Sequence, residues 1–385
     1  MTMVKKRIAV LGSTGSIGRN ALLVIASLKD RIEIVALSAD SNIKELSIQA
    51  KKFNPKVVCV RDRSLAEKLK GKISSGIDIL KGTSGLEEIV SRGDVDMVLF
   101  AISGSACLLP LVRAINNGKR IALANKEALV SGGSIVMPLV KKKRVSIIPI
   151  DSEHSAIFQC FEGKRKFLKK ISLTATGGPL LDVPKMKFDT ISRGIILNHP
   201  KWKMGNKISV DSATMMNKGL EIIEARWLFD VEEDRIDVLV HPEAIIHSMI
   251  ELIDGTVFAQ MSLPDMRIPI QYAITYPERL DTRAGFTDFP RVKNLSFREP
   301  DLSKFPSLRL AREALLDGGT YPAVLNAADE EAVSGYLYGK INFSRIPIMI
   351  EKVLERHNGV KRELVIGDIM EAESWAREEI KKLCR

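Results

Sequence analysis

The chain has 385 residues, of which 45% are hydrophobic, so it is long and apolar enough for two or three folded domains and is not a disordered protein. The net charge of +11 would suit a nucleic-acid-binding protein, but the basic residues are scattered and only 5% of residues are aromatic. A positive field that attracts small anionic substrates explains the charge equally well.

The first 150 residues alternate short apolar runs with amphipathic helical patterns. The runs that we interpret as strands are RIAVLG, IEIVALSA, KVVCV, VDMVLFAIS, RIALAN and VSIIPI. This alternation predicts an α/β domain over residues 1–150 with a doubly wound, Rossmann-like parallel sheet. The apolar run near the N-terminus is too short for a signal or membrane segment, and the cysteines show no CxxC spacing. We therefore expect a cytoplasmic protein that has neither a disulfide framework nor a zinc site.

A glycine-rich loop, GSTGSIG at residues 12–18, follows the first strand and precedes a helix. This context brings backbone N–H groups to a pyrophosphate and predicts dinucleotide binding, although an ordinary glycine-rich turn has the same letters. Beyond the second strand, Asp40 would accept a hydrogen bond from a ribose 2′-hydroxyl, which favours NADH. Its neighbours Ser41 and Asn42 can still donate to a 2′-phosphate.

Acidic residues follow the sixth strand, where open α/β sheets bind their ligands. Asp151 and Glu153 flank Ser152 in this segment, and helix capping alone would explain them. If Glu221 joins them, the site is all-oxygen and selects Mg²⁺ or Mn²⁺ over zinc. Lys126, at the end of the fifth strand, can reach the same edge.

The segment from His199 to Glu221 is rich in polar side chains. We interpret Asp211-Ser212 as the N-cap of a helix whose first turns present Asn217, Lys218 and Glu221 at a positive helix end, where a phosphate would bind. The alternative is a capping serine with a Lys218–Glu221 surface ion pair. Thr176, in a turn after another strand, offers a second phosphate contact.

The rhythm changes after residue 150. We predict an α+β domain over 151–280 with a mixed or antiparallel sheet, a linker over 281–306, and a helical bundle over 307–385 whose last helix begins with Asp368 as a capping residue. The long polar segment 177–206, which contains His199 and Trp202, is typical of a flexible lid. We expect His241 and His247 to be structural.

The motifs GSTGSIG, ALANKEALV, PIDSEHSAIFQ, HPKWKMGNKISVDSATMMNKGLEIIEARWLF and HPEAIIHSM together resemble the 1-deoxy-D-xylulose-5-phosphate reductoisomerase family over nearly the whole chain. The resemblance implies a homodimer whose central domain is catalytic. The metal ligands that it implies are Asp151, Glu153 and Glu221. The substrate contacts are Lys126, Ser152, Glu153, Thr176, His199, Trp202, Ser212, Asn217, Lys218 and Glu221. The cofactor contacts are Thr14, Gly15, Ser16, Ile17, Asn42, Asn125, Glu127 and Gly205.

The reaction implied by the resemblance is the NADPH- and divalent-metal-dependent isomerisation and reduction of 1-deoxy-D-xylulose 5-phosphate to 2-C-methyl-D-erythritol 4-phosphate, in non-mevalonate isoprenoid biosynthesis. Asp151, Glu153, Glu221 and Lys126 would be the catalytic residues, with Lys126 assisting proton movements. Asp40-Ser41 stands where the family generally has Gly-Lys, which weakens the expected preference for NADPH over NADH.

Two other functions are compatible with parts of the sequence. A semialdehyde dehydrogenase has a similar glycine loop but needs a nucleophilic thiol, and only Cys107 lies near a strand end. A basic nucleic-acid-binding protein would show steeply salt-dependent DNA affinity. With the enzyme assignment, we expect a small sugar phosphate as the ligand, and neither nucleic acid nor a membrane as a partner.

Overall fold

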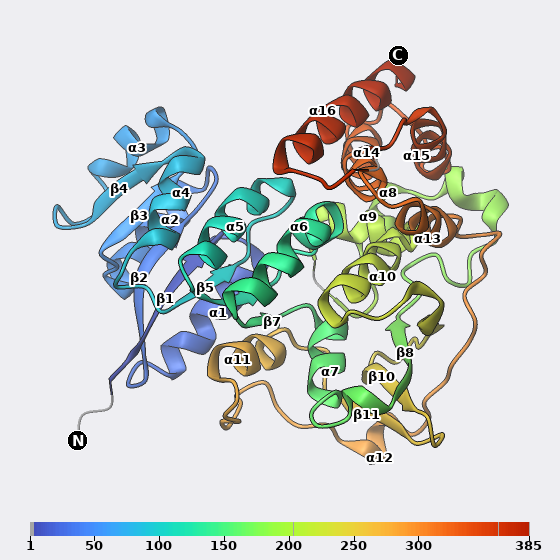
Figure 1. Cartoon of the computed structure of the whole chain (residues 1–385), viewed down its shortest axis with the longest axis horizontal. Helices are drawn as coiled ribbons and strands as arrows, with labels where there is room; N and C mark the ends of the chain where they lie inside the picture. The colour runs from blue at the N-terminus through green and yellow to red at the C-terminus, as the bar shows by residue number, and fades with distance from the viewer. Residues whose placement is uncertain (1–3, 203, 361, 385) are drawn as a thin grey trace. The chain divides into compact units, whose positions relative to one another are not determined.

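The computed structural model describes residues 4–202, 204–360 and 362–384. The chain folds into two compact units, and Figure 1 labels most of their helices and strands. The first unit comprises Met1–Ala128, Val136–Ser155 and Asp265–Gly285. The second comprises Leu129–Ile135, Ala156–Pro264 and Phe286–Arg385. The functional boundaries expected near residues 150, 280 and 306 stay a prediction.

The described part of the first unit contains a seven-stranded sheet in the order β4-β3-β2-β1-β5-β6-β7, and every pair of neighbouring strands is parallel. Strands β3 and β5 are buried along their whole length, as expected for a parallel sheet that helices cover on both faces. The strand bounds are β1 (Lys6–Leu11), β2 (Ile32–Ser38), β3 (Val57–Val60), β4 (Asp78–Lys81), β5 (Met97–Phe100), β6 (Arg120–Leu123) and β7 (Ile147–Pro149). The predicted doubly wound sheet is therefore confirmed.

The edge strand β4 was absent from the sequence prediction, which gave only six strands. Its sequence, DILK, has charged residues at both ends and is only partly buried, so it lacks the apolar run that marks the other strands. It pairs with β3, from Val57↔Asp78 to Val60↔Lys81. Edge strands need burial on fewer sides, and their sequence signal is correspondingly weak.

The helices of the first unit follow from right-handed crossovers between parallel strands. Helices α1 and α11 pack against each other, and so do α4 and α5. Their bounds are α1 (Ser16–Ser27), α2 (Ile43–Phe53), α3 (Arg63–Lys70), α4 (Gly82–Ser91), α5 (Leu108–Asn116), α6 (Glu127–Lys143), α7 (Ser152–Cys160) and α11 (Arg267–Thr275). Residues of α6 and α7 are divided between the two units.

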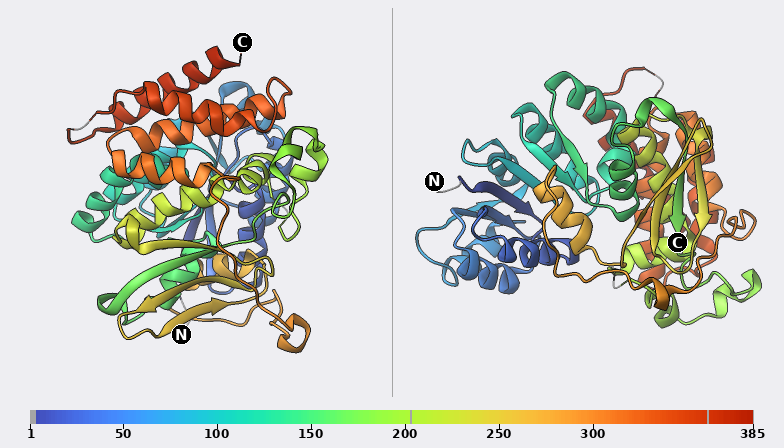
Figure 2. Two further views of the ribbon diagram at one scale, coloured as in Figure 1. Left: turned by 90° about the vertical axis from the view of Figure 1, so that its right-hand side faces the viewer. Right: turned by 90° about the horizontal axis from the view of Figure 1, so that it is seen from below.

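The described part of the second unit contains a four-stranded mixed sheet in the order β11-β10-β8-β9 (Figure 2). β8 (Leu168–Ala175) runs parallel to β9 (Ile236–Val240) and antiparallel to β10 (Ile246–Leu252), and β11 (Val257–Met261) is the edge strand beside β10. The helices of this unit are α8 (Arg193–Leu197), α9 (Asn206–Thr214), α10 (Met216–Phe229), α12 (Phe289–Val292), α13 (Ser307–Asp317), α14 (Tyr321–Leu337), α15 (Arg345–Arg356) and α16 (Ile366–Leu383). The mixed sheet and the helical C-terminal region agree with the sequence.

The segment 177–206 is not the structureless stretch that its composition suggested. It includes a 3-10 helix over Lys185–Thr190 and helix α8, and Phe188 and Ile196 are buried in the hydrophobic core of this unit. Asp189 accepts hydrogen bonds from the backbone N–H and hydroxyl of Ser344, at 3.0 and 2.7 Å. Apolar side chains spaced among the polar ones therefore hold most of this segment against the C-terminal helices.

The predicted start of the last helix was two residues late. Helix α16 begins at Ile366, and Asp368 lies in its first turn, where its carboxylate accepts from the backbone N–H of Val365 at 2.9 Å. A carboxylate in the first turn complements the helix dipole as well as a capping residue does, which explains the shift. None of the helices in the described ranges is long and apolar enough to cross a membrane.

Candidate functional site

The glycine loop of the first unit has the geometry of a phosphate cradle. Gly12 has a φ of +83°, and a Cβ on it would lie 2.3 Å from the carbonyl oxygen of Ala101. A Cβ on Gly18 would lie 2.3 Å from the carbonyl oxygen of Gly12. Helix α1 starts at Ser16 with no side-chain cap on its N-terminal N–H groups, so these remain available to an anion. The loop fits a pyrophosphate.

The buried Ser13 fastens this loop to the rest of the sheet. Its hydroxyl donates to the side-chain oxygen of Gln49 at 2.6 Å, and the Gln49 amide donates back to the Ser13 carbonyl at 3.0 Å. The backbone N–H of Gly12 donates to the Ser38 hydroxyl at 2.9 Å. These contacts could not be predicted, because nothing in the local sequence marks Gln49 as a partner of the loop.

The predicted ribose edge lies after β2. Asn42 is the N-cap of α2, and its amide oxygen accepts from the backbone N–H of Glu45 at 3.1 Å. Asp40 forms an ion pair with Arg61 at 3.1 Å, with both side chains exposed. Asp40 is therefore not the isolated anion that its sequence context indicated, because a guanidinium lies beside it.

Asn125 connects the loops after β5 and β6. Its amide donates to the carbonyls of Ile102 and Gly104, at 2.9 and 3.0 Å, and its oxygen accepts from the backbone N–H of Ala128 at 2.8 Å. Glu127, in the first turn of α6, is buried. These three hydrogen bonds give Asn125 a structural role, since they hold the loops after β5 and β6 together. A contact with the cofactor would be a second role for the same residue.

The first unit gathers the acidic and basic groups that follow β6 and β7. Asp151 lies between β7 and α7, and its Oδ2 lies 3.0 Å from the Nζ of Lys126. Its Oδ1 lies 3.1 Å from the Nδ1 of the buried His154. Ser152 donates to Glu153 at 2.5 Å within the first turn of α7. The predicted neighbourhood of Lys126 and Asp151 is present.

In the second unit, the predicted N-cap at Asp211-Ser212 is wrong. Both residues lie inside α9, which ends at Thr214, and Met215 adopts a left-handed conformation with a φ of 60° before α10 begins at Met216. The sequence has no glycine at this junction, so the break between the two helices had no local signal. Ser212 instead lies against the glycine turn after β8, since a Cβ on Gly178 would meet its carbonyl oxygen at 2.6 Å.

Glu221 is fully buried in α10. Asn217 and Lys218, one turn earlier on the same helix, donate to its two oxygens at 2.5 Å each. The Lys218–Glu221 pair was weighed above as a surface ion pair, but both side chains are at most 5% exposed. Burial of a carboxylate is costly without such partners, so this arrangement must be maintained by the fold.

Thr176 and His199 form the other polar pair of this unit. The Nδ1 atom of His199 accepts from the backbone N–H groups of Lys201 and Trp202, at 3.2 and 3.0 Å. Its proton is therefore on Nε2, which donates to the Thr176 hydroxyl at 2.8 Å. Gly178 N–H also donates to that oxygen, at 3.3 Å. Both acceptor positions of the hydroxyl are filled, so Thr176 is set to donate its own proton to an anion.

The remaining residues on the segment and sheet have clear positions. Trp202 lies near His247, with ring centroids 6.2 Å apart, and Gly205 precedes α9 as an exposed cap residue. His241 stacks on Phe297 at 5.0 Å, and its Nε2 accepts from two backbone N–H groups. The structural role expected for His241 is confirmed.

All four cysteines are free thiols, and Cys107 is fully buried. Burial raises the pKa of the Cys107 thiol well above its usual value, and it raises the pKa of Cys59 to about 12 and that of Cys160 to about 11. Cysteine nucleophiles need a lowered pKa and access to substrate. Cys107 has neither, which argues against a semialdehyde dehydrogenase.

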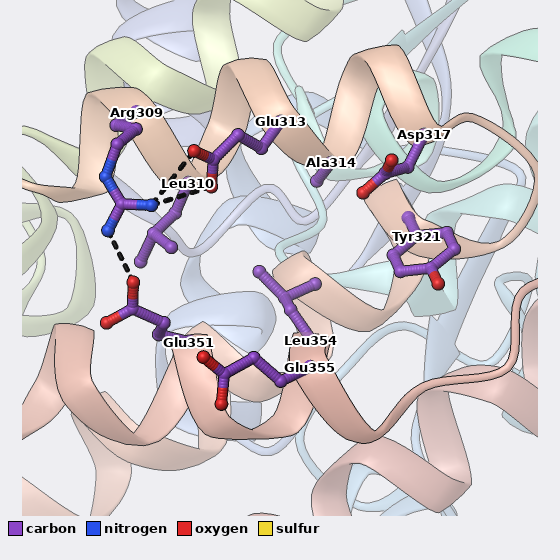
Figure 3. A pocket seen from close by; sticks show the side chains of 9 residues that line it. All are labelled: Arg309, Leu310, Glu313, Ala314, Asp317, Tyr321, Glu351, Leu354 and Glu355. Atoms are coloured by element: carbon purple, nitrogen blue, oxygen red, sulfur yellow. Dashed lines mark hydrogen bonds and ion pairs between the residues drawn. The ribbon is translucent and has the colours of Figure 1, made fainter.

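A separate pocket in the second unit lies between α13 and α15 (Figure 3). Its guanidinium, from Arg309, is already engaged by Glu313 at 2.8 Å and by Glu351 at 2.5 Å. None of the residues predicted for the site lines it. Its lining residues are Arg309, Leu310, Glu313, Ala314, Asp317, Tyr321, Glu351, Leu354 and Glu355.

Comparisons with known proteins agree over the whole chain. Residues 8–133 match the family model described as 1-deoxy-D-xylulose 5-phosphate reductoisomerase, and residues 147–229 and 261–379 match two models of C-terminal domains of that enzyme. The reductoisomerase of Thermoanaerobacter pseudethanolicus is 50% identical, with 98% of this chain and 99% of the relative covered.

Solved structures agree as well. The reductoisomerase from Zymomonas mobilis in complex with NADPH has a TM-score of 0.93 and 39% identity, covering 99% of this chain and 100% of that one. A reductoisomerase in complex with NADPH, fosmidomycin and magnesium has a TM-score of 0.94 and 38% identity, covering 98% and 99%.

Proposed function

Since this chain belongs to the 1-deoxy-D-xylulose 5-phosphate reductoisomerase family, we propose that its first unit holds NADPH, that its second unit holds the phosphate of the sugar, and that Asp151, Glu153 and Glu221 bind the metal. The chain is an oxidoreductase that converts 1-deoxy-D-xylulose 5-phosphate to 2-C-methyl-D-erythritol 4-phosphate with NADPH and a divalent metal ion. When bound, NADPH supplies the hydride for reduction and the cation polarises a carbonyl oxygen.

The nucleotide half of the proposal rests on the glycine loop. The backbone N–H groups of Ser16 and Ile17 bind the pyrophosphate at the uncapped start of α1, with Thr14 beside them. Gly15 is the N-cap residue, and its own N–H donates to the Gly12 carbonyl at 3.2 Å, so it contributes a close approach of the backbone to the ligand. A side chain at Gly18 would fill this cradle, which supports a ligand that approaches the backbone closely. Asn42, Asn125, Glu127 and Gly205 complete the proposed contacts.

The metal half rests on the buried Glu221, the single observation that carries the assignment. Asp151, Glu153 and Glu221 make up a set of candidate metal ligands. These donors are all carboxylate oxygens, which suit Mg²⁺ or Mn²⁺. Asn217 and Lys218 fix the orientation of the Glu221 carboxylate, as outer partners of metal ligands do.

The phosphate of the substrate is held by residues of the second unit. Lys218 supplies the positive charge, and Thr176, Ser212 and Asn217 supply hydrogen-bond donors. His199 orients the Thr176 hydroxyl toward the phosphate, because its Nε2 proton is donated to that oxygen. Trp202 closes over the substrate. Phe188 and Ile196 are buried, so we assign closure to the part of segment 177–206 that carries Trp202.

Lys126 holds and moves protons in the proposed mechanism. It lies 3.0 Å from Asp151, where its ammonium group can stabilise a developing oxyanion or donate a proton to an alkoxide oxygen of the sugar. Ser152, bonded to Glu153 at 2.5 Å, orients that carboxylate and contacts the substrate.

A homodimer in the cytoplasm is part of the proposal. On the edge strand β11, Val257 and Phe258 are 53% and 37% exposed, and Ile253 in the preceding turn is 69% exposed. Apolar side chains on an unpaired sheet edge suit association with a second copy. Free thiols on all four cysteines suit a reducing compartment.

The test follows the absorbance of NADPH with purified protein, with and without the deoxyxylulose phosphate and with and without Mg²⁺ or Mn²⁺. We expect oxidation of NADPH only when both sugar and metal are present. Oxidation that proceeds in excess chelator would refute the metal assignment, and absence of oxidation under all conditions would refute the activity.

A further inference from the structure

The edge of the sheet after β2 and β3 carries an arginine that the proposed coenzyme site does not yet use. The two strands pair in parallel up to Ser38↔Cys59, and they lie next to each other in Figure 1. Hydrogen bonds continue past the strands, because Ala39 N–H donates to the Cys59 carbonyl at 3.0 Å and Arg61 N–H donates to the Asp40 carbonyl at 3.1 Å. The backbone therefore holds Arg61 directly beside Asp40.

The side chains of these two residues also meet. The Nη1 of Arg61 lies 3.1 Å from the Oδ2 of Asp40, and its Nε lies 3.6 Å from the Oδ2 of Asp62. Asp62 is committed elsewhere, since its other oxygen caps α3 by accepting from Leu65 N–H at 3.0 Å. The Arg61 side chain is 58% exposed and the Asp40 side chain is 68% exposed. Such exposed pairs contribute little to folding, so stability alone does not account for this one.

The location of the pair suggests its purpose. In dinucleotide-binding sheets, the ribose of the adenosine rests at the carboxyl end of β2, where an acid selects a 2′-hydroxyl and an arginine accommodates a 2′-phosphate. Here both are present, and the arginine neutralises the acid. Arginine has five N–H donors in a planar fork, so it can bind a phosphate while it keeps one contact with Asp40.

We propose that Arg61 binds the 2′-phosphate of NADPH and is the residue that sets the coenzyme preference of this chain. The backbone hydrogen bond from Arg61 N–H to the Asp40 carbonyl, and not the Asp40 carboxylate, keeps Arg61 at the ribose edge. Ser41, next in sequence, adds a hydroxyl donor. The inference rests on the proposed placement of NADPH in the first unit, and it explains how a chain with Asp40-Ser41 at this edge uses NADPH.

The experiment measures the binding of NADPH and NADH to the full chain by nicotinamide fluorescence, without sugar or turnover. In Arg61→Gln we expect the dissociation constant for NADPH to rise about ten- to a hundredfold, the value of one charge-assisted hydrogen bond, while that for NADH changes less than about twofold. Arg63→Gln is the matched control, because Arg63 is an exposed arginine two residues away whose loss removes the same charge. It should change both constants by less than about twofold.

Two further readouts sharpen the result. Asp40→Asn should leave NADPH binding intact or tighter, since an anion leaves the phosphate site. Rising salt should weaken NADPH binding more in the wild type than in Arg61→Gln, because a phosphate–guanidinium contact is screened. Equal losses for NADPH and NADH in Arg61→Gln, or no loss for either, would overturn the inference. Wild-type protein that binds no NADPH would instead overturn the proposed function.

Discussion

Replacing Gly18 by alanine tests whether the close packing of α1 on the glycine loop builds the coenzyme site. The added Cβ would lie 2.3 Å from the Gly12 carbonyl oxygen and 2.5 Å from the Ser13 Cα. An ordinary contact begins near 3.4 Å, so helix and loop must separate by roughly an ångström. Both neighbours are backbone atoms that Ser13 and Gln49 hold in place, and no flexible side chain can move aside.

Overpacking of this kind costs about 1–3 kcal/mol of unfolding free energy. A displacement of this size at the N–H groups of Ser16 and Ile17 should also weaken NADPH binding by about tenfold or more. The assays are urea unfolding without ligand and a fluorescence titration with NADPH. We expect a lower unfolding midpoint and a higher dissociation constant.

Gly15→Ala is the stability control within the same loop. Its nearest atom, the Gly12 carbonyl oxygen, is 3.5 Å from the added Cβ, and Gly15 has an ordinary φ of −73°. The loss of a good N-cap residue and the reduced entropy of the unfolded chain nearly cancel, so its stability should stay within about 0.5 kcal/mol of the wild type. If Gly18→Ala unfolds at the same urea concentration as Gly15→Ala, the close contact of Gly18 with the loop backbone does not contribute to stability.

Three other changes have defined outcomes. Glu221→Gln should lower kcat/KM at least about a hundredfold and raise the Mg²⁺ concentration needed for turnover. Glu232 is an exposed acid, and Glu232→Gln should change neither quantity. Near-wild-type turnover of Glu221→Gln at low Mg²⁺ would show that Glu221 is not a metal ligand. Alkylation with iodoacetamide should leave turnover unchanged, because burial raises the pKa of Cys107 well above its usual value; rapid inactivation at one modified thiol would contradict this. Burial lowers the pKa of His357 below its usual 6.5, so the unfolded chain binds more protons below that pH and stability should fall as pH drops from about 7 to about 5. In His357→Gln, urea midpoints over that range should fall less steeply than in the wild type, and an unchanged slope would rule this histidine out.

The parts of the fold that could be predicted from sequence are those with strong local patterns. A few consecutive residues are enough to predict the buried strands β3 and β5, and the same holds for the glycine loop. The charged strand β4 has no such pattern, and it was not predicted. The left-handed Met215 between α9 and α10 has none either, so the helix start was predicted at Asp211-Ser212, which lie inside α9. Both depend on tertiary packing.

The same distinction holds for the candidate site. His199 and Glu221 stand out as polar residues in a polar segment, but their partners come from geometry that a sequence does not display. The pairing of Arg61 with Asp40 depends on the register of β2 and β3, which is fixed only once the sheet has formed. The sequence alone therefore indicates a negative charge at the ribose edge, whereas in the structure the guanidinium of Arg61 compensates the carboxylate of Asp40.

The fixing of the glycine loop by Ser13, Gln49 and Ser38 has a consequence for how coenzyme preference can change. The loop is ordered before any ligand arrives, so binding does not have to immobilise it, and this cost is met during folding. The side chains of Arg61 and Asp40, in contrast, are exposed, and they contact each other at the surface. Substitutions at these two exposed positions can therefore change which nicotinamide coenzyme the protein binds, while the structure of the glycine loop stays the same.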